Sequence, residues 1–183
     1  MTRESSIAAP IALLAAASGA RSMTGIAAVA RVRASAESGN GDRGLGPRIV
    51  GRFDRTIANT ATALAVFEMM ADKAPHIPDR IDPGPLFGRV VAGAVVGAGV
   101  AQLTGVDRRV PAIAGAVTAF VGAQLSFRMR RALAESMPGF AAGLVEDAIV
   151  IGIGAAGAAL LRTSLGVRQA EPVERGSIVL ETA

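Results

Sequence analysis

The sequence predicts an all-α fold: an integral membrane helical bundle of about five helices that are transmembrane or partly re-entrant. Of its 183 residues, 51% are hydrophobic and only 19% are charged, whereas soluble domains carry about 25% charged residues. The apolar residues fall into five segments, each approaching the roughly 20 residues that cross a 30 Å hydrocarbon core as a helix. The 22 glycines and many alanines predict close helix packing. A soluble all-α domain is the alternative.

The first two segments are interrupted or short. Ile7 to Val32 contains Arg21 and is interrupted by Ser18 to Ser22. Its apolar character resumes after Arg21, which favours an uncleaved first span over a signal peptide. Ile57 to Ala71 has about 15 residues, fewer than a full crossing needs. We expect either segment to be a half-helix or a re-entrant element that neighbouring helices cover.

The other three segments are predicted to be full crossings. The third and fourth are joined by the short link Asp107 to Arg109, which predicts an antiparallel hairpin. The fifth follows after a more polar stretch. These segments are Leu86 to Leu103, Val110 to Phe127 and Phe140 to Leu161.

Two connections and the C-terminal end are predicted to lie outside the membrane. Ala34 to Arg55 is rich in glycine and polar residues and is predicted to be a solvated loop. Pro75 to Pro85 carries four prolines in eleven residues, so we expect it to be extended or turned. We predict a single helical membrane domain over residues 1–165 and a polar, disordered tail over residues 166–183.

The distribution of basic residues predicts an orientation. Lys and Arg on alternating sides of a chain with five crossings are more numerous on the side that holds the C-terminus. The positive-inside rule therefore predicts a cytoplasmic C-terminus and an external N-terminus. A miscounted span would invert this orientation.

Composition excludes several classes of function. The chain has no cysteine, and His76 is the only histidine, which excludes a thiolate site and argues against zinc chemistry. Trp and Tyr are absent, so six Phe and flanking Arg residues must serve as interface anchors. The arginines have no aromatic residues between them, which favours anionic lipid head groups over nucleic acid. We expect no cofactor: Gly152 to Gly157 matches G-x-G-x-x-G but follows no strand.

Carboxylates within two apolar segments are the main functional signal. Glu68 and Asp72 end the second segment, and Glu146 and Asp147 lie within the fifth. An ionised carboxylate in hydrocarbon costs at least about 2.5–3.5 kcal/mol, so such residues face a partner or a water-filled path. The predicted polar intramembrane site comprises Arg21, Glu68, Asp72, Lys73, Arg80, Glu146 and Asp147.

Within this site we expect the residues to differ in role. Asp72 is expected to lie at the interface beside Lys73 and Asp147 to turn away from the centre, because adjacent helical residues point about 100° apart. Glu68 and Glu146 are then the candidates to meet Arg21. A cluster of structural ion pairs is the alternative to a functional site.

A glycine groove is predicted on the third segment. Gly93, Gly97, Ala101 and Gly105 recur every four residues, so that a neighbouring helix can approach closely. We interpret this groove as a helix contact, within the fold or in a homodimer, rather than as a solute path.

Three motifs resemble a known family. They are Gly19-Ala20-Arg21-Ser22-Met23-Thr24, then Glu68-Met-Met-Ala-Asp72-Lys73-Ala-Pro75 with Pro78 and Arg80, and then Glu146-Asp147. Together they resemble a family of small bacterial multi-spanning membrane proteins catalogued as a domain of unknown function. The resemblance covers roughly Ala8 to Leu161 and implies a multi-pass protein of the bacterial inner membrane, with these residues as its motif. It implies no activity.

The sequence leaves three functions open. The first hypothesis is a small channel or carrier for an ion or small polar solute, with the carboxylates as cation or proton acceptors. The second is a non-catalytic scaffold or accessory subunit that binds a partner helix, or a second copy, through the glycine groove. The third is an intramembrane enzyme that holds Mg²⁺ on Glu and Asp. We lean against an enzyme, because no nucleophile with a base partner is apparent.

Overall fold

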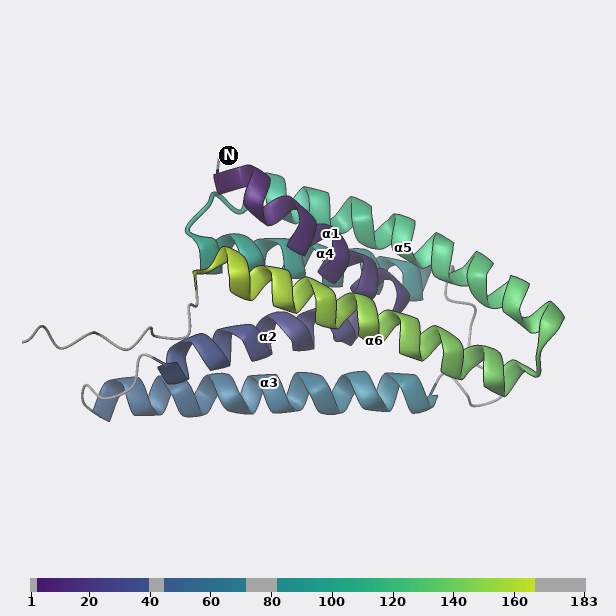
Figure 1. The fold of residues 1–183 in the computed structure, drawn as a ribbon, viewed down its shortest axis with the longest axis horizontal. Coiled ribbons are helices and arrows are strands. Elements are labelled where there is room, and N and C mark those ends of the chain that lie inside the picture. The colour runs from purple at the N-terminus through teal and green to yellow at the C-terminus, as the bar shows by residue number, and fades with distance from the viewer. Residues whose placement is uncertain (1–2, 40–44, 72–81, 167–183) are drawn as a thin grey trace, which may run out of the picture.

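The computed structural model describes residues 3–39, 45–71 and 82–166, and all the regular structure in these ranges is helical. The helices alternate in direction along one common axis, so that each runs opposite to the one before it (Figure 1). The predicted helical bundle is therefore confirmed. Its helices are α1 (Arg3–Ala20), α2 (Ser22–Gly39), α3 (Leu45–Ala71), α4 (Pro83–Thr104), α5 (Arg109–Ser136) and α6 (Gly139–Ser164).

Helices α4, α5 and α6 are long and apolar enough to cross a membrane. They contain 22, 28 and 26 residues, or about 33–42 Å of helix at 1.5 Å per residue. Only 28–39% of the residues in their most apolar stretches are buried within the protein. Large side chains such as Phe87, Val117 and Leu125 therefore point outward. An apolar surface of this extent is consistent with contact with a lipid bilayer.

The first predicted segment forms two helices. Its interruption is a reversal of the chain at Arg21, so that α1 and α2 form a hairpin whose two far ends lie at the same end of the bundle (Figure 1). Gly25 lets the two helices approach closely, because a Cβ atom there would overlap the carbonyl oxygen of Leu14. We call the turn at Arg21, between these two helices, the break.

This reversal corrects the predicted orientation. A chain with five crossings has its ends on opposite sides, whereas the start of α1 and the end of α6 lie at the same end of the bundle (Figure 1). The sequence does not distinguish a helix that continues past Arg21 from one that turns back there, since both keep the same apolar residues.

The predicted loop Ala34 to Arg55 is mostly helical. Helix α2 continues to Gly39 and α3 begins at Leu45. Ala34 is buried, and Arg33 Nε lies 3.3 Å from Asp54 Oδ1, which ties the end of α2 to α3. These contacts between helices stabilise helical backbone that the composition alone does not favour. The prolines at 83 and 85 lie in the first turn of α4, where a helix tolerates them. Of the predicted tail, only Gly166 is described.

Glycines bring α4 and α5 into close contact. A Cβ atom on Gly93 would overlap the backbone of Gly115, and one on Gly97 would overlap that of Pro111. Ala101 is fully buried. Gly105 does not extend this contact: it ends α4 with φ of 70°, and a Cβ atom there would meet nothing. The contact lies within the fold, and α5 occupies the predicted groove.

A candidate functional site at the break between α1 and α2

The break leaves backbone groups that need partners inside the bundle. The last carbonyls of one helix and the first N–H groups of the next have no partner within their own helices. Arg21 meets part of this need, because its N–H donates to Ala17 O over 2.8 Å and its carbonyl accepts from Thr24 N–H over 3.0 Å. Arg21 is 1% exposed, so side chains rather than bulk water must supply the remaining partners.

Arg89 of α4 caps the end of α1. Its Nη1 donates to Gly19 O over 2.8 Å and also to Ala20 O. Arg89 is itself buried. A cation at this position also interacts favourably with the negative end of the helix dipole.

Glu68 of α3 caps the start of α2 in the complementary way. Its Oε1 accepts from Ser22 N–H over 2.9 Å and its Oε2 from Met23 N–H over 3.0 Å. Oε1 also lies 3.7 Å from Arg89 Nη2. The Arg89–Glu68 ion pair therefore spans the break, with each charge at the helix terminus whose dipole it complements.

The side chain of Arg21 binds the carboxylates of α6. Its Nη2 donates to Asp147 Oδ1 and lies 4.0 Å from Glu146 Oε2. Glu146 is completely buried and also contacts α5, accepting from Ser126 Oγ over 2.5 Å and lying 3.6 Å from Arg130 Nη1. These contacts join α5 and α6 to the break.

Among the residues that the structure describes, the ion pairs at the break join equal numbers of positive and negative groups. Three arginines face three carboxylates, and all but Arg130 and Glu68 are at least nine-tenths buried. A buried charge without a partner costs several kcal/mol, and hydrogen-bonded opposite charges offset that cost. We call these residues the buried charge cluster: Arg21, Arg89, Arg130, Glu68, Glu146 and Asp147.

The structure brings together much of the predicted polar site. Arg21, Glu146 and Asp147 are in direct contact, and Glu68 joins them through Arg89 and the backbone at the break. Asp72, Lys73 and Arg80 lie outside the described residues. The prediction that Asp147 turns away from the centre is wrong. Asp147 makes the closer contact with Arg21, because Glu146 lies on the side of α6 that faces Ser126 on α5.

Sequence reasoning missed three members of the site. Arg89 interrupts the start of the third apolar segment, and the cost of a charge in hydrocarbon could have singled it out as it did Arg21. Ser126 and Arg130 carry no such signal, because they lie near the end of the fourth segment, where polar residues are expected.

Neither a metal site nor a relative identifies the chemistry. In the described parts of the chain, no group of three or more His, Cys, Asp or Glu side chains could hold a metal ion. Comparison of the chain with protein-family models, curated proteins and solved structures found no match. The family resemblance therefore stays a prediction.

Proposed function

We propose that this protein is a small channel or carrier in the bacterial inner membrane, and that an ion or small polar solute passes the buried charge cluster. The observation that carries the proposal is the buried turn at Arg21, where the end of α1 and the start of α2 meet inside the bundle. Discontinuous helices with inward-facing ends form the ion and solute sites of many transporters. Ionised residues within a membrane commonly mark such a path.

The chemistry of the cluster favours a cation or a proton as one transported species. Glu68, Glu146 and Asp147 are held by arginines from other helices. An ion pair between helices breaks when those helices move apart, which leaves a carboxylate ready to accept a cation or a proton. The conformation in which these ion pairs are formed then corresponds to an occluded state of the channel or carrier.

Flux through proteoliposomes tests this proposal. Purified protein is reconstituted, and uptake of H⁺, Na⁺ and K⁺ is followed for the wild type, Glu68→Gln and Glu146→Gln. We expect flux in the wild type and its loss in both variants, at unchanged helical content. Glu135→Gln is the control, because Glu135 is an exposed carboxylate near the end of α5. Flux that survives both cluster substitutions would refute the proposal.

A second candidate is a non-transporting scaffold or accessory subunit. The ion pairs among the described residues favour it, because paired charges that cap a buried turn need no transport role to explain them. The predicted docking of a partner helix at Gly93 and Gly97 would have to displace α5. This candidate predicts no flux in the wild type and a stoichiometric partner after mild solubilisation.

We also propose that both described ends of the chain face the cytoplasm. Of the arginines whose side chains are described, more lie at the end of the bundle that holds the start of α1 and the end of α6 (Figure 1). Arg31, Arg33, Arg55, Arg108, Arg109 and Arg162 lie there, against Arg128, Arg130 and Arg131 at the other end. The positive-inside rule assigns the richer end to the cytoplasm.

Single cysteines test this orientation, because the chain has none of its own. Ser35→Cys and Thr163→Cys lie at the proposed cytoplasmic end, and Ser136→Cys lies at the other. A membrane-impermeant maleimide should label only the last in intact spheroplasts and all three after permeabilisation. Labelling of Ser35→Cys or Thr163→Cys in intact spheroplasts would contradict the proposed orientation.

A further inference from the structure

A groove of about 300 Å³ lies between α1 and α5, away from the buried charge cluster. Small residues bring these two helices together near the break, where a Cβ atom on Gly122 would lie 2.8 Å from the carbonyl oxygen of Ala16. The groove opens nearer the starts of both helices, over residues 7–12 of α1 and 110–118 of α5. At 1.5 Å per residue it extends for about 12 Å along α5.

The groove is mostly apolar, with a carboxylate at one end. The buried side chains of Ile7 and Ile11 line it on α1, and the exposed Ala8 and Ala114 leave it open to the surroundings of the bundle. Asp107 lies in the turn before α5, at the end of the bundle. A ligand that fits this order has a polar head at the membrane interface and an apolar chain below it.

The carboxylate at this end is open to a ligand. Asp107 is exposed, and its Oδ1 accepts the N–H of Arg109 over 2.8 Å. Among the residues that the structure describes, Asp107 forms no ion pair. The side chains of Arg108 and Arg109 follow it and are exposed as well. This end of the groove therefore offers one negative and two positive groups on three consecutive residues.

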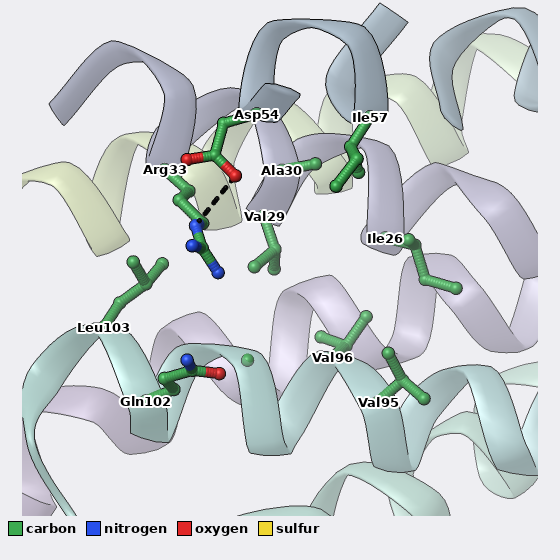
Figure 2. A pocket seen from close by; sticks show the side chains of 11 residues that line it. Ile26, Val29, Ala30, Arg33, Asp54, Ile57, Val95, Val96, Gln102 and Leu103 are labelled. Carbon is green, nitrogen blue, oxygen red and sulfur yellow. Dashed lines mark ion pairs between the residues drawn. The ribbon is translucent and has the colours of Figure 1, made fainter. Parts of the chain in front are cut away.

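The cleft between α2, α3 and α4 has the opposite arrangement. There Arg33 Nε lies 3.3 Å from Asp54 Oδ1, so that the two charges bind each other (Figure 2). Asp54 is also buried. A charged ligand in that cleft would have to compete with an ion pair that joins two helices, whereas a ligand at Asp107 would not.

We propose that the groove between α1 and α5 binds phosphatidylethanolamine, with its ammonium group on Asp107, its phosphate beside the arginines that follow, and one acyl chain along the apolar part. An ammonium group donates charge-assisted hydrogen bonds to a carboxylate, and arginine donates them to phosphate. The head group carries one charge of each sign, as this end of the groove does. Phosphatidylcholine has the same charges but no N–H group to donate to Asp107.

Thermal stability in detergent, measured against the concentration of added lipid, tests the proposal. We expect phosphatidylethanolamine to stabilise the wild type at an about two- to fivefold lower concentration than phosphatidylcholine, the size expected of one exposed ion pair. Asp107→Asn removes the charge but keeps an acceptor for Arg109 N–H, so the two lipids should then act at nearly the same concentration. Glu135→Gln is the matched control and should keep the preference, because this exposed carboxylate lies near the other end of α5.

Two further arms separate the acyl chain from the head group. Ala114→Phe fills the apolar part from an exposed position, so the protein should fold but lose the response to phosphatidylethanolamine. Ala148→Phe, at an exposed position of α6 outside the groove, should keep that response. Phosphoethanolamine offers the head group without a chain and should not stabilise the protein.

Four outcomes would overturn the proposal. They are a wild type without preference between the two lipids, an unchanged preference in Asp107→Asn, equal responses of Ala114→Phe and Ala148→Phe, and stabilisation by phosphoethanolamine in place of the lipid.

Discussion

Two turns in this molecule join antiparallel helices in opposite ways. The α4–α5 turn lies at the surface and is capped by its own residues. Gly105 adopts φ of 70° and its N–H bonds Ala101 O, while Asp107 Oδ1 accepts the N–H of Arg109 over 2.8 Å. The α1–α2 turn is buried, and its caps come from residues 46 and 70 positions away in the sequence, Glu68 and Arg89.

The difference shows what burial demands of a turn. At the surface, water and one local side chain satisfy the ends of two helices. Inside the bundle, the same backbone groups need acceptors and donors from other helices. The charges at the break therefore have a structural reason to exist, whatever else they do. Evidence for a further function of these charges must therefore go beyond their burial and their pairing.

The largest expected effect comes from removing Arg21 itself. Arg21→Met keeps much of the side chain's length but leaves Asp147 and Glu146 without the guanidinium between them. Breaking a buried ion pair on one side costs about 3–5 kcal/mol. We expect a loss of this size in the free energy of unfolding, measured by denaturant titration in mixed micelles.

Arg108→Met gives the matched measurement at the exposed α4–α5 turn, where we expect almost no change. Adding Asp147→Asn to Arg21→Met should recover part of this stability, because it replaces the buried carboxylate that lost its arginine with a neutral amide. Equal stability of the two single variants would contradict the importance of burial at the break.

This contrast also explains how far the sequence could predict the site. Helices and apolar faces follow from composition and segment length, and the cost of a charge in hydrocarbon singled out Arg21, Glu68, Glu146 and Asp147. These are local properties of each segment. The reversal at Arg21 is not, since it depends on whether other helices supply the caps.

For the same reason, the sequence could not predict which carboxylate pairs with which arginine. Glu68 was expected to meet an arginine side chain at Arg21, but it binds the backbone of Ser22 and Met23 instead. Arg89 provides the charge that Glu68 faces. Identifying the charged residues in a sequence does not reveal the backbone groups that a turn leaves without helical partners. Here those backbone groups determine which carboxylate meets which arginine.

A smaller effect is expected from filling the close contact beside the break. A Cβ atom on Gly19 would lie 2.9 Å from the nitrogen of Ala123 and would overlap the carbonyl of Ala119, all backbone atoms of α5 that cannot move aside alone. Gly19→Ala should therefore cost about 1–3 kcal/mol through overpacking. Thermal unfolding in detergent measures it.

Gly152→Ala is the control for that substitution. It lies within α6, and a Cβ atom there would meet nothing. Alanine favours helix over glycine by up to about 1 kcal/mol, so this variant should be as stable as the wild type or slightly more so. If both variants stabilise the protein, α1 does not pack on α5 as closely as the structure has it.

The finest comparison sets the carboxylate at the start of α2 against the one that precedes α5. Glu68 accepts two backbone N–H groups, one on each oxygen, whereas Asp107 accepts one. An amide has a single acceptor oxygen, so Glu68→Gln leaves one buried donor unsatisfied and should cost about 1–3 kcal/mol. Asp107→Asn keeps its one bond and should change stability by no more than about 0.5 kcal/mol, because the amide oxygen of Asn accepts the same backbone N–H, as in an Asx turn. Unfolding titrations of both variants measure the difference. Equal losses would mean that α2 does not need the second hydrogen bond to Glu68.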